Sequence, residues 1–235
     1  MNTQPEIYLS HPHPCDYLPG CRAQTLFLPP DTELDIVRYS ALVANGFRRS
    51  GRLVYRPHCP DCQACVPVRV PVDRFRPNRS QRRCWRKNRD LIVTARPAEF
   101  RREHYALYRR YLEARHGDGN MADSSPGDYT NFLLCDWCDT RFYEFRHGET
   151  LLAVAVVDVL EDSLSAVYTF FDPAQSERGL GTYAILWQIA AARRMGLRWL
   201  YLGYWIAQCG KMAYKNCFQP LEYFQGNRWH NRFPP

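Results

Sequence analysis

Three hydrophobic runs in the second half of the chain constrain its fold most, because they follow one another with very short connections. They cover residues 142–146, 151–160 and 165–171. The connections contain the turn-forming pairs His147-Gly148 and Glu161-Asp162. Short polar turns between runs of this kind are typical of antiparallel hairpins. The sequence therefore predicts an antiparallel meander of three strands.

Helical patterns stand on both sides of these strands. Residues 98–116 place most of their aromatic side chains on one helical face, and residues 180–195 are amphipathic and end at Gly196. Residues 199–204 predict a further strand, and residues 117–128 are a loop by composition. The second half therefore runs helix, meander, turn, helix, strand.

This order resembles the acetyltransferase-like (GNAT) α/β fold. The turn Arg178-Gly179-Leu180-Gly181 stands where that fold has its phosphate-cradling loop, and free N–H groups at a helix N-terminus suit an anion. A plain turn is the alternative interpretation. Where the resemblance implies Gln or Arg three residues before the first glycine, this chain has Ser176, which argues against ordinary coenzyme A binding.

The first half of the chain is rich in proline, cysteine and arginine. We expect residues 1–95 to form a smaller subdomain packed on a GNAT-like catalytic domain of residues 96–235, an α/β (α+β) architecture overall. Residues 34–45 have helical spacing, and residues 53–55 predict a short strand. Residues 66–72 (VPVRVPV) predict a strand at a sheet edge or a bulge, because proline cannot donate to a β-ladder.

Positive charge is concentrated in residues 48–89, which carry thirteen Arg or Lys and only two acids, Asp61 and Asp73. This stretch is net +11, whereas the whole chain is +7, so the remaining residues sum to −4. Such a block is typical of a surface that binds a polyanion, most often a phosphate backbone.

A basic helix is predicted over residues 80–91, inside this block. Five cations lie at spacings that put several of them on one helical face: Arg79, just before this range, and Arg82, Arg83, Arg86 and Lys87. A phosphate-binding helix and a solvated charged helix both fit this pattern. The near absence of compensating acids favours phosphate.

The chain has no apolar stretch near the roughly 20 residues that span a bilayer. Its first fourteen residues lack the features of a signal peptide, so we expect a cytoplasmic protein. There the ten cysteines should be thiols or metal ligands rather than disulfides. The pair Cys135 and Cys138 is a weak motif by itself.

A cysteine knuckle, HCPDCQAC, places Cys59, Cys62 and Cys65 at C-x2-C-x2-C spacing. Three thiols at this spacing indicate zinc or an Fe–S cluster, and a reduced cluster packed in the core is the alternative. Closed tetrahedral coordination needs a fourth ligand.

Three segments of the chain are similar to the aminoacyl-tRNA–protein transferases. They are residues 46–51 (GFRRSG), 55–58 (YRPH) and 201–222 (YLGYWIAQCGKMAYKNCFQPLE), within a resemblance that runs from about Cys15 to about Phe224. The sequence looks closest to the bacterial aspartate/glutamate leucyltransferases. This resemblance implies transfer of leucine from leucyl-tRNA to proteins with N-terminal Asp or Glu, which marks them for N-degron degradation. It also implies a structural or redox role for the N-terminal cysteines. Within it, Cys15 of the segment CDYLPG (15–20) is the first choice of fourth ligand and Cys21 the second.

The chemistry of that reaction agrees with the absence of a nucleophile motif from the sequence. The donor is an activated ester, and the acceptor α-amine has an unperturbed pKa of about 7.7–8.0, so much of it is neutral without a strong base. Catalysis then consists mainly of positioning and oxyanion stabilisation. The chain has no G-x-S-x-G nucleophile motif, and we expect no small-molecule cofactor.

Site residues are assigned within these motifs. We expect Lys211, Tyr214 and Lys215 to act as catalytic residues that contact either the acceptor end of the tRNA or the acidic side chain of the protein substrate. The two lysines share a face if the segment is helical. A solvated basic face is the alternative. The residues expected to hold the aminoacyl-tRNA are Arg79, Arg82, Arg83, Lys87, Arg178, Gly179 and Gly181. Those expected to grip the acceptor carboxylate, or else phosphate, are Arg48, Arg49 and Arg56.

Other functions fit parts of the sequence. The same scaffold with arginyl-tRNA as donor would need an acidic rather than an apolar side-chain pocket. A non-catalytic tRNA-binding module with a structural metal knuckle would need no acyl-transfer scaffold. A small-molecule N-acetyltransferase is opposed by Ser176 and by the basic block. Neither a membrane nor DNA is expected as a partner.

Overall fold

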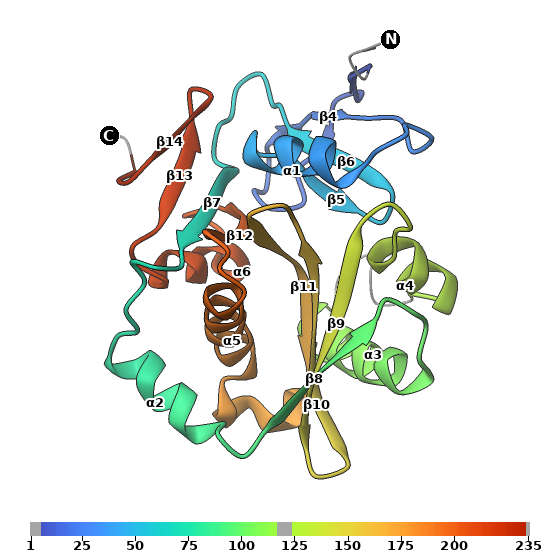
Figure 1. Ribbon diagram of the computed structural model, residues 1–235. Helices are drawn as coiled ribbons and strands as arrows, with labels where there is room; N and C mark the ends of the chain where they lie inside the picture. Colours follow the sequence, from blue (N-terminus) through green and yellow to red (C-terminus); the bar gives the residue numbers. More distant parts are fainter. Residues whose placement is uncertain (1–5, 117–123, 234–235) are drawn as a thin grey trace.

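A mixed β-sheet forms the centre of the protein (Figure 1). We describe it from a computed structural model that covers residues 6–116 and 124–233. In sheet order, the eight strands found among these residues are β14 (Arg228–His230), β13 (Glu222–Gln225), β7 (Val66–Pro71), β12 (Trp199–Trp205), β11 (Ser163–Phe171), β10 (Thr150–Val159), β9 (Asp139–His147) and β8 (Ile92–Pro97). β11 and β12 are parallel, and the other neighbours are antiparallel.

The predicted meander is confirmed as β9, β10 and β11. β10 is buried on both faces: Ala153 and Ala155 belong to one core cluster, and Val154 and Val156 to another. Because side chains alternate along a strand, a strand covered on both sides has a continuous hydrophobic run in its sequence. Apolar burial on both faces therefore stabilises the centre of the sheet.

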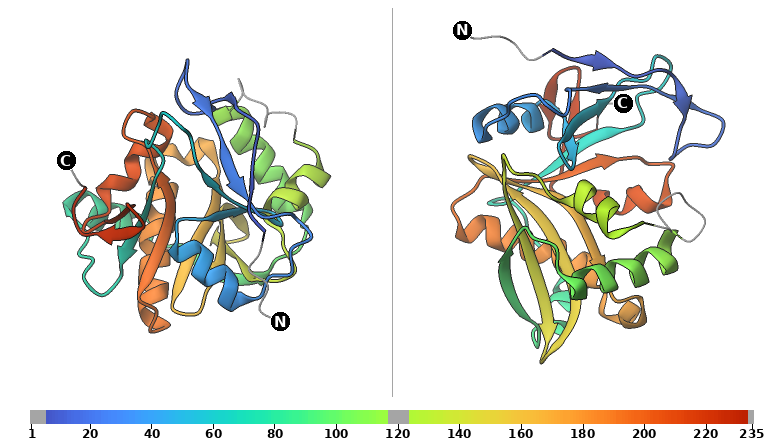
Figure 2. Two further views of the ribbon diagram at one scale, coloured as in Figure 1. Left: turned by 90° about the horizontal axis from the view of Figure 1, so that it is seen from above. Right: turned by 90° about the vertical axis from the view of Figure 1, so that its right-hand side faces the viewer.

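Helices cover the two faces of this sheet (Figures 1 and 2). On one face lies α5 (Leu180–Arg194), with α2 (Arg79–Lys87) packed against it. On the other face lie α3 (Arg102–His116) and α4 (Pro126–Leu133). The predicted helices over 98–116 and 180–195 are thus confirmed, and so is the basic helix.

Helix α4 corrects the predicted loop over residues 117–128. Residues 117–123 lie outside the described residues, but Ser125 is the N-cap of α4 and Pro126 is its first residue. Ser125 and Asp128 form a capping box, which satisfies two N–H groups at the helix start. The loop-forming composition of this segment therefore concealed a helix start, for which Ser-Pro followed by an acid is a known signal.

Strand β7 is not at an edge of the sheet, so the edge alternative was wrong, whereas the bulge alternative fits its irregular pairing with β12. It lies between β12 and β13, and β13 pairs only with Val68 and Arg69, which stand between Pro67 and Pro71. The irregularity lies in the other neighbour, where the register of β12 shifts between Tyr201 and Gly203. Short pairing on one side and a shifted partner on the other accommodate the two missing N–H groups.

A second, smaller layer covers one end of the sheet (Figure 1). It contains the strands β1 (Tyr8–Leu9), β4 (Thr25–Phe27), β6 (Leu53–Pro57) and β5 (Arg48–Ser50), the pair β2 (His13–Pro14) and β3 (Arg22–Ala23), and helix α1 (Ile36–Ala44). Its core includes Tyr39 and Val54 and continues into Leu160 and Tyr201 of the main body. The predicted division at residue 95 stays a prediction; the main sheet takes β7 and most of β8 from the N-terminal side of it.

In the ranges 6–116 and 124–233, we find no helix whose length and apolar character would let it cross a membrane.

Candidate acyl-transfer site

The parallel strands β11 and β12 separate partway along their length. They pair only where Ser163, Leu164 and Ser165 face residues 199–201, although β11 continues to Phe171. Beyond this point the carbonyl groups of β11 and β12 no longer face N–H groups of the other strand. We call this place, beyond Ser165 and Tyr201, the fork.

Arg48 of β5 inserts its guanidinium into the fork. It donates hydrogen bonds to the carbonyl oxygens of Ala166 at 2.7 Å and Val167 at 2.9 Å on β11, and of Leu202 at 3.5 Å on β12. One side chain thus satisfies acceptors on both strands. The space for it exists because residue 203 is glycine: a Cβ there would lie 1.6 Å from Arg48 Nη1, and its φ of +73° also favours glycine.

Lys215 lies beside the fork with its amine in the protein interior. The residue is only 4% exposed, and Nζ donates to the Tyr204 carbonyl oxygen at 2.5 Å. The register partner of Tyr204 is Pro67, which has no N–H to offer that strand. Burial lowers the pKa of Lys215 well below its usual value, and the positive charge of Arg48 lowers this pKa further. Lys215 is therefore an amine that readily stays neutral.

The segment that carries Lys211 and Lys215 is not one regular helix. It consists of α6 (Gly210–Ala213) followed by the 3-10 turn η2 (Tyr214–Cys217). The condition under which the two lysines would share a face, a single helix, is therefore not met, and Lys211 is exposed whereas Lys215 is buried. The change of helix type at Tyr214, which is 47% exposed, turns the second lysine inward.

Arg49 and Arg56 occupy different surroundings from Arg48. The Arg49 side chain is fully buried and forms a two-pronged ion pair with Asp158, at 2.7 Å from Nε and from Nη2. Its carboxylate partner is therefore in its own chain, not in an acceptor protein. Arg56 donates to the Asn45 carbonyl oxygen at 2.8 Å and covers the ring of Phe47.

The Arg49–Asp158 pair is part of a buried network. Thr140 Oγ1 donates to Asp158 at 2.8 Å, and the Tyr39 hydroxyl donates at 2.9 Å. Burial alone opposes the charge of Arg49, but Asp158 outweighs this effect and raises the pKa of Arg49 above its ordinary value. Sequence reasoning missed Asp158, whose signal was a lone acid within a buried hydrophobic strand.

Helix α2 presents its predicted basic face to solvent. The side chains of Arg79 and Arg83 are exposed and have no hydrogen-bond or ion-pair partner among the described residues. Arg82 donates to the Pro77 carbonyl oxygen at 2.6 Å, and Lys87 donates to the Glu177 carbonyl oxygen at 2.9 Å. Two of the four predicted tRNA-binding cations on this helix are thus free, and two contact backbone.

The glycine turn follows the 3-10 segment η1 (Pro173–Arg178), and the C-terminal end of α2 contacts it through Cys84 and Asn88. Arg178 forms a two-pronged ion pair with Asp90, at 3.0 and 2.9 Å. Gly179 has a φ of +63° and accepts a hydrogen bond from the Cys84 thiol at 3.4 Å. The ring of Phe171 lies against Gly181, where a Cβ would approach it to 3.1 Å. Side chains of the same chain therefore occupy the surroundings of this helix start.

The N-terminal thiols lie in one neighbourhood. Burial raises the pKa of Cys65 to about 12, and charges on Cys59, Cys15 and Cys62 raise it further. Even so, no group of three or more Cys, His, Asp or Glu side chains in the described ranges is arranged to hold a metal ion. As placed here, the four thiols do not fit the predicted zinc or Fe–S site, and we derive no chemical step from one.

The Cys135–Cys138 pair shows a separate thiol environment. A hydrogen bond with Cys138 and the charge of Arg49 lower the pKa of Cys135 to about 7, although burial opposes this shift. We expect iodoacetamide at pH 7.5 to label Cys135 faster than Cys65, as measured by peptide mass spectrometry. Cys138→Ala, which removes this hydrogen bond, should slow that labelling. Equal rates for Cys135 and Cys65 would contradict the assigned environments.

The fold and the fork together define a class of protein. Helix, meander, glycine turn, helix and parallel strand follow in the order of the acetyltransferase-like fold, with a buried low-pKa amine beside the separating strands. This is the scaffold of an enzyme in which an amine attacks an acyl group.

Comparison with known proteins gives the family. The sequence matches the description "Arginine-tRNA-protein transferase, N terminus" over residues 13–83 and "Arginine-tRNA-protein transferase, C terminus" over residues 103–225. The chain belongs to this family and is an aminoacyl-tRNA–protein transferase. It is 57% identical to the aspartate/glutamate leucyltransferase of Nitrosococcus oceani, covering 95% of this chain and 94% of the relative. The enzyme of the same name from Alcanivorax borkumensis is 53% identical, with 95% and 92% covered.

Solved structures are more distant. L-PGS from Bacillus licheniformis matches with a TM-score of 0.48 and 12% identity, covering 62% of this chain and 48% of that one. FemX matches with a TM-score of 0.45 and 9% identity, covering 77% and 75%.

Proposed function

We propose that this enzyme transfers leucine from leucyl-tRNA to the N-terminal Asp or Glu of proteins, which marks them for N-degron degradation. The observation that carries this function is the 57% identity over nearly the full length of both chains. The arginyl-tRNA alternative keeps the same chemistry, but the relatives from Nitrosococcus oceani and Alcanivorax borkumensis carry the name of leucyltransferases.

The proposed chemistry is aminolysis of an ester. The acceptor α-nitrogen attacks the leucyl carbonyl carbon, a C–N bond forms, the ester C–O bond breaks, and the tRNA ribose oxygen leaves. Lys215 in its neutral form accepts the proton that the α-amine loses, and this proton then passes to the departing ribose oxygen. The lowered pKa of Lys215 supports this role, since a base must be unprotonated near the operating pH.

Arg48 positions this reaction rather than carrying it out, in our proposal. Its hydrogen bonds to both strands keep the fork open at the place where an extended acyl group would enter. Arg56 is the better candidate for the acceptor carboxylate, since its guanidinium makes one hydrogen bond within the described residues and has further N–H groups to donate. Lys211 and Tyr214, both exposed beside Lys215, are proposed to contact the tRNA acceptor end.

The exposed face of α2 is proposed to bind the tRNA backbone. Arg83→Ala should weaken tRNA binding and reduce the slope of log Kobs against log salt by about 0.7 to 0.9, the value for one lost phosphate contact. Titrations at several salt concentrations measure this slope. Arg110→Ala is the matched control and should leave the slope unchanged, because it removes from α3 a charge that is also exposed and has no partner within residues 6–116 and 124–233. An unaltered slope for Arg83→Ala would remove this residue from the tRNA surface.

We further propose that no small-molecule cofactor takes part and that the enzyme works in the cytoplasm, where its tRNA substrate is charged. An acyl group already activated as an ester needs no further activation. Neither point depends on the N-terminal thiols.

A transfer assay tests the function. The purified protein, radiolabelled leucyl-tRNA and peptides that begin with Asp, Glu, Arg or Ala are combined, and label on each peptide is counted. Leucine on the Asp and Glu peptides alone is the expected result. Tight tRNA binding without transfer to any peptide would instead favour the non-catalytic binding module.

A further inference from the structure

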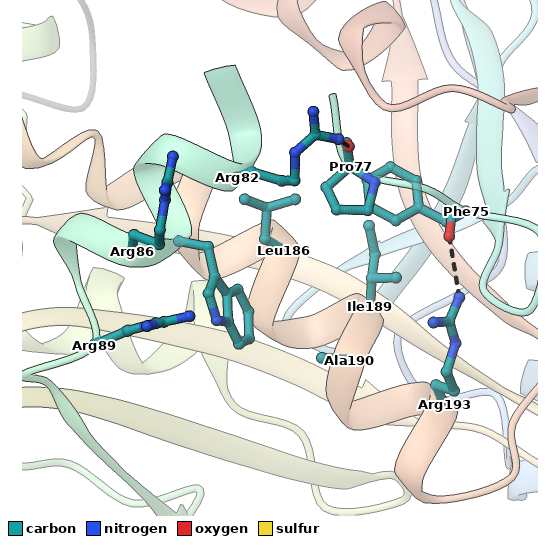
Figure 3. Close-up of a pocket in the computed structure, with 10 residues that line it drawn as sticks. Phe75, Pro77, Arg82, Arg86, Arg89, Leu186, Ile189, Ala190 and Arg193 are labelled. Carbon is teal, nitrogen blue, oxygen red and sulfur yellow. Dashed lines mark hydrogen bonds between the residues drawn. The ribbon is translucent and has the colours of Figure 1, made fainter. Parts of the chain in front are cut away.

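A cavity of about 410 Å³ lies between α2 and α5, apart from the fork (Figure 3). Its size falls within the usual range of ligand pockets. Leu186, Ile189 and Ala190 of α5 form its apolar wall, and the indole of Trp85 provides a flat aromatic surface. This wall is the part of the cavity that would contact an uncharged ring.

Arginine side chains surround the apolar wall. Arg82, Arg86 and Arg89 come from α2 and the turn after it, and Arg193 lies at the other end (Figure 3). Arg193 is held by the carbonyl oxygens of Val72 at 3.0 Å and Phe75 at 3.1 Å. No acidic side chain is among the described residues that line this cavity.

Two of these arginines are unpaired. The side chains of Arg86 and Arg89 are exposed and have no hydrogen-bond or ion-pair partner in the part of the chain that the structure describes. Aromatic and guanidinium planes next to unpaired cations form the combination that binds an unstacked base together with its phosphates.

We propose that this cavity binds one unpaired nucleotide of the tRNA, with its base against Trp85 and its phosphates on Arg86 and Arg89. The inference rests on the proposed function, because it takes the tRNA as the ligand. It adds a base contact to a surface otherwise expected to contact only the backbone. Positive charge also continues along α2 to Arg79 and Arg83, beyond the reach of a single anionic head group, which favours a polymeric anion over a lipid.

The test separates the base from the phosphates. Ala190→Phe fills the cavity without changing charge, and Arg86→Ala with Arg89→Ala removes charge without filling it. We expect Ala190→Phe to weaken binding of uncharged tRNA by roughly 5- to 100-fold, the range for one lost base stack, with the salt slope unchanged. The double arginine variant should lower the salt slope by about 1.4. Arg110→Ala should do neither.

Chemical probing of the bound tRNA gives a second readout. One unpaired base should lose its reactivity toward dimethyl sulfate with the wild-type protein and keep it with Ala190→Phe. Trp85→Leu repeats this readout if Ala190→Phe lowers the urea unfolding midpoint. Wild-type affinity and protection in both cavity variants would overturn the proposal.

Other ligands give different results. Binding of AMP that Ala190→Phe blocks, with tRNA binding unaffected, would assign the cavity to a free nucleotide and overturn the tRNA contact. Binding of palmitate that Ala190→Phe blocks, with tRNA binding unaffected, would assign the cavity to an apolar acid and would also overturn the tRNA contact. Protection of a base without leucine transfer would contradict the proposed function but support the cavity assignment. Leucine transfer by Ala190→Phe with the wild-type KM for leucyl-tRNA would support the function but contradict the cavity assignment.

Discussion

Lys215→Met is expected to lower kcat for leucine transfer by about 10²- to 10⁴-fold, the usual contribution of a general base. Lys215→Arg should be nearly as slow, because a guanidinium keeps the charge but cannot accept a proton. In the wild type, kcat should rise with pH through the lowered pKa of Lys215, since the neutral amine is the active form. The inflection from Lys215 should vanish in both variants, leaving only that of the acceptor α-amine. A pH series of kcat measures this.

Lys211→Met is the matched control for this prediction. Lys211 is four residues away and exposed, so its loss should raise KM for leucyl-tRNA and leave kcat within about threefold. If Lys215→Met retained kcat within threefold of wild type, Lys215 would be a structural lysine that only donates a hydrogen bond to the Tyr204 carbonyl.

The burial of Lys215 also affects how the stability of the protein depends on pH. Between its lowered pKa and about 10.4, Lys215 binds more protons in the unfolded chain, so stability rises with pH over this window.

Asp158→Ala should lower the free energy of unfolding by about 3–5 kcal/mol, because it leaves the buried Arg49 guanidinium without a counter-charge. Thr140 and Tyr39 would lose their acceptor in the same step. Urea unfolding followed by tryptophan fluorescence measures the change. The effect should be large because both partners are fully buried, and a buried charge is costly without its pair.

Asp162→Ala supplies the comparison for Asp158. Asp162 is paired with Arg198 at 3.8 Å on the surface, where both side chains are about half exposed or more, so its loss should cost under about 1 kcal/mol. Combining Asp158→Leu with Arg49→Met should restore much of the loss, since an apolar pair leaves no unpaired charge. A loss below 1 kcal/mol for Asp158→Ala would show that the buried network does not stabilise the fold as described.

The meander and helix α5 could be predicted from sequence because their signals are local. An alternating or continuous apolar run sets a strand, and a 3.6-residue period sets a helix. The place of β7 could not be predicted in this way. Its insertion between β12 and β13 joins segments more than 100 residues apart, and its prolines suggested an edge. The N–H groups that these prolines lack are instead accommodated because the partner strand β13 pairs with only two residues of β7.

In the candidate site, too, local features could be predicted from sequence, whereas features that depend on distant segments could not. The motif of residues 201–222 indicated Lys215, but its burial and lowered pKa depend on the turn at Tyr214 and on Arg48 from a distant strand. Arg48 and Arg49 are adjacent in sequence, yet one enters the fork and the other the core, because neighbouring strand residues point to opposite faces. Gly203 carried a usable signal, since a lone glycine within a strand pattern marks a close approach.

The proposed transfer of leucine can be tested by a competition between two donors. Equal amounts of leucyl-tRNA and arginyl-tRNA are offered together to the wild-type enzyme with a peptide that begins with Asp, and the product is identified by mass spectrometry. We predict a peptide extended by leucine alone. A peptide extended by arginine, or no extended peptide at all, would contradict the account.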